Sequence, residues 1–175
     1  MGTYNIIDYV TISSTGNATD FGDRLNSDAK VRLSGACASS TRGVMGGGIV
    51  TNVMDYVTIA STGNATDFGD LTVARYALTA TASTTRGVFF QGYDANTIDY
   101  ITIASTGNST DFGDHTSGVN AYQGACSNAT RATVGGGAGA SDQIEYVTIA
   151  STGNTTDFGN LSVGRTIPAA LSGSA

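Results

Sequence analysis

The sequence is poor in the residues on which several classes of protein depend. It has no tryptophan, one proline and one histidine, and only 13% of its residues are charged. Its eight lysines and arginines are scattered and its net charge is −6, whereas a protein that binds phosphates needs clustered cations. It also lacks an apolar run of about 18 residues, the length that a membrane-spanning helix requires. We therefore expect neither nucleic acid nor a membrane among its partners.

Cysteine is scarce as well, and its two copies, Cys37 and Cys126, stand far apart. Small secreted domains that are held by disulfides have a denser cysteine framework. We expect two free, buried thiols that pack as small apolar residues. Residues 1–7 have neither the basic start nor the apolar core of a signal peptide, so the sequence does not assign the chain to an export pathway.

Glycine, serine, threonine and asparagine are abundant, and they come with residues that favour β-strands. Threonine, valine, isoleucine, tyrosine and phenylalanine suit strands, and no segment has apolar residues at helical spacing over three turns. The 175 residues are enough for one domain with a sizeable core. The composition predicts a folded, all-β domain.

One sixteen-residue segment, DYVTIASTGNATDFGD, occurs four times with few changes. The copies begin at Asp8, Asp55, Asp99 and Glu145. A looser second block lies between them and contains an arginine six residues before a glycine. Such a period predicts stacked units or a propeller. We expect a single repeat domain over residues 1–175, with units starting near residues 8, 55, 99 and 145 and a last unit that lacks its final strand. The residues with an expected structural role in the repeat are Tyr9, Tyr56, Tyr100, Tyr146, Phe21, Phe68, Phe112, Phe158, Arg42, Arg86, Arg131, Gly48, Gly92 and Gly137.

Each unit predicts four short strands. DYVTIA and TDFG form two of them, on either side of an STGN turn in which Gly63 and Asn64, for example, tolerate a positive φ. LTVARYALTATAS forms the third strand and RGVFFQG the fourth. Four strands in about 45 residues match the size of a propeller blade.

The order of a glycine pair, the tyrosine of DY, the TGN turn and the aromatic residue of TDF resembles a kelch-type blade. Gly47-Gly48 and Gly136-Gly137 keep the glycine pair, Gln91 replaces its first member in the middle unit, and phenylalanine stands where kelch repeats have tryptophan. This resemblance implies a β-propeller with about four kelch-like blades per chain. The uniform DYVTIASTGNATDFGDL segment is also similar to kelch-like, virion-associated proteins of marine phages. That second resemblance implies a location in a virion or on an extracellular surface, with other virion proteins as partners.

The strand count suggests an incomplete ring. The sequence has four strands of the DY type, four of the TDF type, four that contain or follow the AR motif, and three of the RGV type. The ring closes with a strand missing, the chain is part of a longer array, or several copies assemble. Because an unpaired strand edge invites pairing with another edge, we favour the last two explanations, and a homo-oligomer in particular.

Two sets of polar residues are candidates for a site. The paired acids Asp20 and Asp23, Asp67 and Asp70, and Asp111 and Asp114 offer oxygen ligands for calcium, or the first acid of each pair caps a turn. We favour the turn, because a pair of acids falls short of the six or more ligands that calcium takes. The arginines at 42, 86 and 131 either bind backbone carbonyls or an acid of the adjacent blade, or they line a central channel and meet an anionic ligand.

The single histidine, His115, argues against an enzyme. It is not repeated, since Arg24, Leu71 and Leu161 take its place in the other units, and we expect it to face solvent. A serine or threonine nucleophile needs a base, and one histidine cannot serve four near-identical sites. We expect a non-enzymatic structural or protein-interaction propeller, a phage virion component or host-contacting module that uses the variable stretches 48–54, 93–98 and 138–144. The alternative is a carbohydrate-binding propeller, in which the repeated asparagine, aspartate and tyrosine bind glycans.

Overall fold

The computed structural model describes residues 5–25, 33–49, 51–93, 95–118 and 121–172, which form fourteen β-strands and no helix. The strands are β1 (Ile6–Tyr9), β2 (Thr19–Asp23), β3 (Gly35–Ala38), β4 (Arg42–Gly46), β5 (Val53–Thr58), β6 (Thr66–Asp70), β7 (Thr79–Ala82), β8 (Arg86–Phe90), β9 (Thr97–Thr102), β10 (Thr110–Asp114), β11 (Gly124–Ser127), β12 (Arg131–Gly135), β13 (Gln143–Thr148) and β14 (Thr156–Asn160). The predicted all-β class is confirmed. Across the described ranges, no helix has the length and apolar character needed to cross a membrane.

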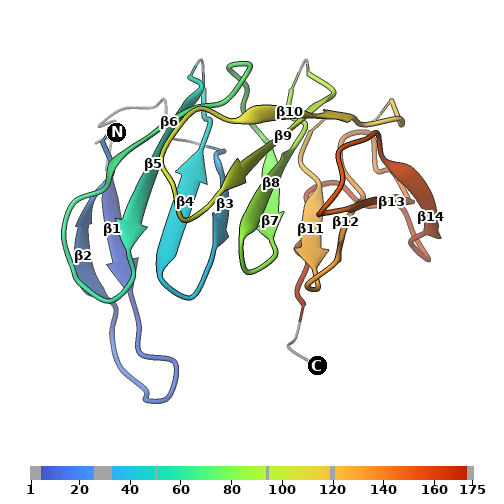
Figure 1. Cartoon of the computed structure of the whole chain (residues 1–175). Coiled ribbons are helices and arrows are strands. Elements are labelled where there is room, and N and C mark those ends of the chain that lie inside the picture. Colours follow the sequence, from blue (N-terminus) through green and yellow to red (C-terminus); the bar gives the residue numbers. More distant parts are fainter. Residues whose placement is uncertain (1–4, 26–32, 50, 94, 119–120, 173–175) are drawn as a thin grey trace.

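The strands form three four-stranded antiparallel sheets and one two-stranded sheet. Sheet 1 has the order β3-β4-β5-β6, sheet 2 comprises β7 to β10, sheet 3 comprises β11 to β14, and β1-β2 form an N-terminal pair. Each full sheet joins the two strands of the looser block to the DY and TDFGD strands that follow them in the chain. The sheets lie side by side in chain order (Figure 1). They form a propeller-like, open series, and the described residues close no ring.

A bulge in every TDFGD strand places the repeated phenylalanine outside the strand ladder. In β10, Asp111 pairs with Asp99 and Gly113 with Ile98, so Phe112 has no partner opposite it. The following glycine has a left-handed φ in all four copies. The values are 144° for Gly22, 136° for Gly69, 145° for Gly113 and 138° for Gly159. A bulge of this kind re-aims a side chain. Each phenylalanine meets the tyrosine of its own sheet edge-on, with ring centroids 5.9 or 6.0 Å apart.

The apolar core lies between the sheets. Val44, Met54 and Phe68 of sheet 1 pack against Phe89 and Ile101 of sheet 2. A second cluster joins the other face of sheet 2 to sheet 3 and contains Val88, Phe90, Ile98, Phe112, Val134 and Val147. Both faces of sheet 2 are therefore covered. This explains why its strands are apolar on both faces, as the sequence predicts for stacked sheets.

The third predicted strand of each unit is shorter than expected. Only residues 79–82 of LTVARYALTATAS form a strand, β7, because residues 71–78 connect two sheets. A corresponding strand was expected after Asn160, and residues 161–172 contain none. That prediction was wrong for the fourth copy. Residues 168–170 nevertheless lie against Gly124, at the edge of β11.

Both cysteines are free thiols. Cys37 is buried, and burial raises the pKa of its thiol to about 12. Cys126 is half-buried, and its Sγ lies 3.2 Å from the Oγ1 of Thr133. Cys37 is therefore not poised as a nucleophile, because a reactive cysteine needs a lowered pKa.

Candidate functional site

The repeated STGN turn of each sheet forms hydrogen bonds with the TDFGD strand of the preceding sheet. At three junctions the turn glycine donates a backbone hydrogen bond to the phenylalanine carbonyl of the preceding sheet, and the next residue, asparagine, accepts one through its side chain. The glycine bonds join Gly63 to Phe21, Gly107 to Phe68 and Gly153 to Phe112, each at 2.7 Å. The asparagine bonds run from the backbone N of Asp23, Asp70 and Asp114 to the Oδ1 of Asn64, Asn108 and Asn154, at 3.0, 3.1 and 2.9 Å. The STGN turn thus also holds neighbouring sheets together through hydrogen bonds.

The repeated arginines lie at the same junctions. Arg42 and Arg86 stack over Tyr56 and Tyr100, with the guanidinium carbon 4.2 and 4.3 Å from the ring centroid. Their Nη1 atoms donate to the carbonyls of Ile103 and Ile149 in the following sheet, at 2.9 and 2.8 Å. These contacts are the ones expected if the arginines bind backbone carbonyls of the adjacent sheet. The third arginine, Arg131, stacks on Tyr146 in the same way, at 4.2 Å.

The acid that precedes the tyrosine in each DY strand is a structural residue that the sequence pattern alone did not single out. Asp55, Asp99 and Glu145 are 1%, 0% and 5% exposed. Each is held by a cation or histidine from the segment that follows the preceding TDFGD strand. The pairs are Arg24 with Asp55 at 2.8 Å, Arg75 with Asp99 at 2.7 Å, and His115 with Glu145 at 2.6 Å. The signal was available, because four acids recur before the tyrosine.

The pair formed by Arg75 and Asp99 is fully buried. Both side chains are 0% exposed, and Thr72 donates a second hydrogen bond to Asp99 at 2.6 Å. The Nη2 of Arg75 also donates to the carbonyl of Phe89, at 3.3 Å. Burial lowers the pKa of Arg75 from its ordinary value, and the adjacent carboxylate of Asp99 opposes that shift. An arginine remains charged under these conditions, so its positive charge balances the negative charge of Asp99 inside the core.

The expectation that His115 faces solvent was wrong. The side chain is buried, with its Nδ1 2.6 Å from the Oε2 of Glu145 and 2.9 Å from the Oγ of Ser117. Burial lowers the pKa of His115 below its ordinary value of 6.5, and Glu145 and Ser117 oppose the shift only in part. The imidazole is therefore neutral at neutral pH. An unrepeated polar residue in a connection is typical of a surface, but here it replaces Arg24 as the partner of a buried acid.

Acidification is expected to destabilise the protein through His115. The depressed pKa means that the unfolded chain takes up a proton before the folded state does, so stability is lost as pH falls below about 6.5. Thermal unfolding followed by circular dichroism between pH 7.5 and pH 5 measures this loss. The double variant His115→Arg with Glu145→Asp rebuilds the Arg24–Asp55 pair and should remove most of the loss. An equal loss in the double variant would contradict the assignment.

The paired acids of the TDFGD strands form local turns. The Oδ1 atoms of Asp20 and Asp111 accept hydrogen bonds from Gly22 and Gly113, at 3.0 and 3.2 Å. No group of three or more His, Cys, Asp or Glu side chains that could hold a metal occurs in the described part of the chain. Calcium at Asp20, Asp23, Asp67, Asp70, Asp111 and Asp114 stays a prediction. The glycines at 48 and 137 donate to the carbonyls of Arg75 and Arg165, at 3.0 and 2.8 Å, and Gly92 donates to Ala95 at 3.2 Å.

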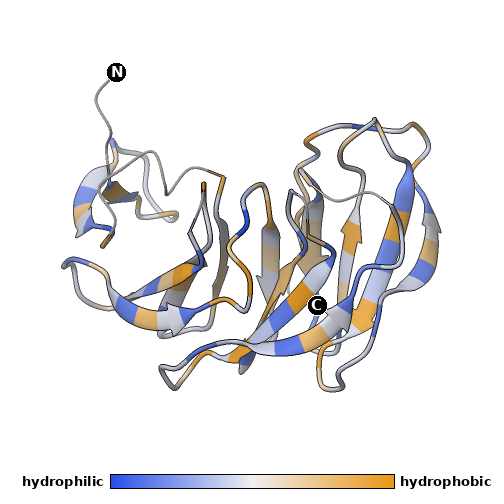
Figure 2. Cartoon of the chain, turned by 90° about the horizontal axis from the view of Figure 1, so that it is seen from above, coloured by the Kyte–Doolittle hydropathy of each residue, from blue (hydrophilic) through white to orange (hydrophobic). Residues whose placement is uncertain are grey.

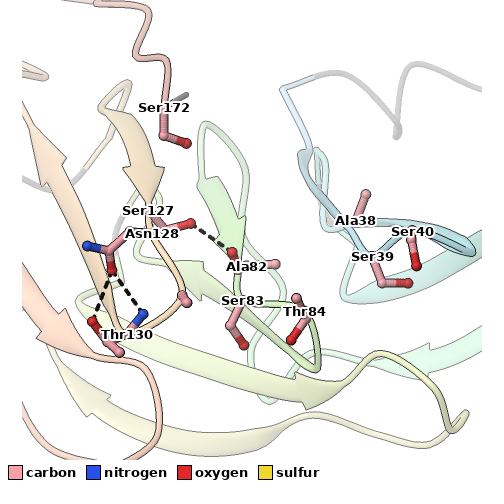
Figure 3. Close-up of a pocket in the computed structure, with 11 residues that line it drawn as sticks. Ala38, Ser39, Ser40, Ala82, Ser83, Thr84, Ser127, Asn128, Thr130 and Ser172 are labelled. Atoms are coloured by element: carbon pink, nitrogen blue, oxygen red, sulfur yellow. Dashed lines mark hydrogen bonds between the residues drawn. The ribbon is translucent and has the colours of Figure 1, made fainter. Parts of the chain in front are cut away.

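A cavity of about 630 Å³ opens where the hairpin turns at the ends of the inner strands β3, β7 and β11 converge. Its lining consists of alanine, serine, threonine and asparagine, without a charged residue (Figure 3). Some of these polar groups shape the turns. The Oγ of Ser83 accepts from the backbone N of Arg86 at 3.1 Å, and the Oδ1 of Asn128 accepts from that of Arg131 at 2.8 Å. The cavity suits an uncharged polar ligand better than an anion.

Comparison with known proteins adds no relative. Neither a family model nor a curated protein matches the chain.

Proposed function

We propose that the chain is a non-enzymatic structural or protein-interaction module of kelch-like β-propeller type. The repeated residues inside the array hold sheets together: Arg42 and Arg86 bind tyrosine rings and carbonyls. The acids at 55, 99 and 145 bind an arginine or a histidine. The observation that carries the proposal is that the array presents apolar side chains at both ends. Phe158 is 53% exposed, whereas Phe68 and Phe112 at the same repeat position are 2% exposed. Large exposed apolar surfaces mark interaction sites.

The molar mass of the purified chain in solution tests this proposal. Multi-angle light scattering over a range of concentrations, with and without a calcium chelator, should give an assembly of two or more 17.7 kDa chains. A monomer at every concentration would contradict a structural role based on the end faces. A mass that falls on chelation would add support for calcium at the paired acids. A virion or host-contacting location is part of the proposal and has its support in the resemblance of the repeat segment alone.

A carbohydrate-binding role is the second candidate, and the cavity of about 630 Å³ favours it because its lining is neutral and rich in hydroxyl groups. The tyrosines at 56, 100 and 146 are covered by arginines and are not free to stack on a sugar. Recognition would therefore depend on hydroxyls such as those of Ser40 and Thr84. Binding on a glycan array that Thr84→Val abolishes would support this candidate, and an array without binding would exclude it for the glycans present.

A further inference from the structure

The two ends of the array present complementary halves of one junction. At three junctions, the TDFGD strand of one sheet contacts the STGN turn that follows the DY strand of the next sheet. The STGN turn of the N-terminal pair and the TDFGD strand of sheet 3 have no such partner among the described residues. These two structures lie at opposite ends of the array in both views (Figures 1 and 2).

Apolar residues of the two halves are more exposed toward the ends than inside the array, and Ile59 of sheet 1, next to the two-stranded N-terminal pair, is 46% exposed. Ile12 is 97% exposed, whereas Ile103 and Ile149, at the same repeat position, are 1% and 2% exposed. Phe158 is more than half exposed on the opposite end, as described above. Inside the chain, a neighbouring sheet of the same repeat covers these positions: the preceding sheet covers the isoleucine and the following sheet covers the phenylalanine. The occupant that fits the open positions is therefore another sheet of this kind.

The charged residues of the two halves are also complementary. Asp8 stands at the repeat position of Asp99, and Arg165 stands at the position of Arg75, in LSVGR and LTVAR respectively. Arg75 and Asp99 form a buried pair, whereas Asp8 and Arg165 are exposed and have no ion-pair partner within the described residues. The guanidinium group of Arg131 likewise has no carbonyl acceptor in that part of the chain, and the carbonyl of Ile12 is at the position that would supply it.

The backbone groups of the outer strands follow the same pattern. Gly16 and Asn17, at the turn positions that join sheets elsewhere, make no bond to a described residue. The TDFGD glycines of three sheets, Gly22, Gly69 and Gly113, lie so close to the turn of the next sheet that a Cβ would collide with its carbonyl. The fourth, Gly159, has the same left-handed φ of 138° and faces open space. This glycine is shaped for a close approach that no described residue makes.

The segment after sheet 3 already occupies the inner-strand position of a further sheet. Pro168 and Ala169 lie against Gly124, as Thr79 and Ala80 of β7 lie against Gly35. The preceding residue, Ile167, has a left-handed φ of 57°, and three residues that stand two positions before an inner strand share it. These are Leu33, Ala77 and Tyr122, with φ of 60°, 57° and 60°. A β-branched residue rarely has a left-handed φ. The same φ at Ile167 therefore indicates that the segment after it starts like an inner strand.

We propose that a second copy of this chain docks head to tail, with its N-terminal pair against sheet 3 of the first copy. This inference rests on the proposed structural function and names its partner. The shared blade has an inner segment, residues 168–170, from one copy and its two outer strands, β1 and β2, from the other. Asp8 and Arg165 become a buried pair across the junction. Such a contact is heterologous, and it closes a ring or continues as a filament according to the rotation between copies.

An apolar cavity of about 390 Å³ lies at a position of the shared blade that no described residue fills. It lies between the N-terminal pair and sheet 1, and its lining includes Ile7, Ala36, Cys37, Met45 and Val57. In the full sheets, this position holds the RGV strand. None of the described residues supplies that strand for the shared blade. The junction therefore depends most on the outer-strand contacts and on the pair of Asp8 and Arg165.

Charge exchange tests the proposal. Asp8→Arg and Arg165→Asp, made separately, place like charges at the junction, and each should raise the dissociation constant of the assembly by roughly 100-fold or more, because an unpaired buried charge is strongly unfavourable. An equimolar mixture of the two variants pairs Arg at position 8 with Asp at position 165, and Asp8 with Arg165. Light scattering should then show single variants as monomers and the mixture as an assembly of the wild-type mass.

Thr66→Arg serves as the matched control, since Thr66 is exposed on β6 and lies at neither end. It should leave the mass unchanged. A wild-type assembly that persists in both single variants, or single variants that stay monomeric when mixed, would overturn the head-to-tail junction while leaving the structural function in place. A wild-type chain that is monomeric throughout would instead overturn both. Circular dichroism of each variant verifies that the exposed substitutions leave the fold intact.

Discussion

Replacing Arg75 with leucine is expected to lower the free energy of unfolding by about 3–5 kcal/mol, because Asp99 would remain buried without its partner. Both side chains are completely buried, and Asp99 keeps only the hydrogen bond from Thr72 once the guanidinium is removed. The substitution also removes the donor to the carbonyl of Phe89. Urea unfolding followed by far-UV circular dichroism or tyrosine fluorescence measures the loss, since the chain contains no tryptophan.

The repeat supplies a control for this experiment. Arg165 occupies the same position in the LSVGR copy but is exposed, so Arg165→Leu should change the free energy of unfolding by no more than about 0.5 kcal/mol in the monomer. Removing both charges with Arg75→Leu and Asp99→Leu should cost less than the sum of the single losses, because no buried charge is left unpaired. Equal losses for Arg75→Leu and Arg165→Leu would contradict the importance of the buried pair.

The strands could be predicted from sequence because the repeat exposes their pattern. DYVTIA, TDFGD and RGV recur in register, so each copy supports the assignment of the others, and the STGN turn separates two of the strands. The grouping of strands into sheets was harder to predict. A sheet takes its RGV strand and its DY strand from neighbouring sequence units, for example β4 from Arg42 and β5 up to Thr58. This choice depends on tertiary packing and has no local signal.

The junction residues show where sequence reasoning reaches its limit. The pattern identified Arg42 and Arg86 as structural but left two roles open for them, because a guanidinium suits a carbonyl and an anion equally. His115 was misassigned because burial of a connection is decided by the sheet that follows it. The acids at 55, 99 and 145 were seen as part of a repeat, yet their partners come from three different sequence contexts. Only the folded chain shows that Arg24, Arg75 and His115 serve the same purpose.

Truncation of Phe68 to alanine is expected to lower the free energy of unfolding by about 3–5 kcal/mol, the usual cost of removing a buried aromatic ring. Phe68 is 2% exposed, packs between sheets 1 and 2, and meets Tyr56 edge-on at 5.9 Å. Phe112→Ala should cost a similar amount, because it occupies the same position between sheets 2 and 3. Chemical unfolding at a protein concentration low enough to keep the chain monomeric gives these values.

Phe158→Ala separates the effect of the residue type from that of its place in the array. The ring has the same neighbour within its sheet, Tyr146 at 6.0 Å, but no following sheet covers it. In the monomer we expect a loss of about 1 kcal/mol or less, the range of a partly exposed aromatic pair. At concentrations where copies associate, the same substitution should weaken the assembly, because the ring would then lie in a junction as Phe68 does. A loss in the monomer as large as that of Phe68→Ala would mean that sheet 3 is covered by its own chain, and it would exclude an open end at Phe158.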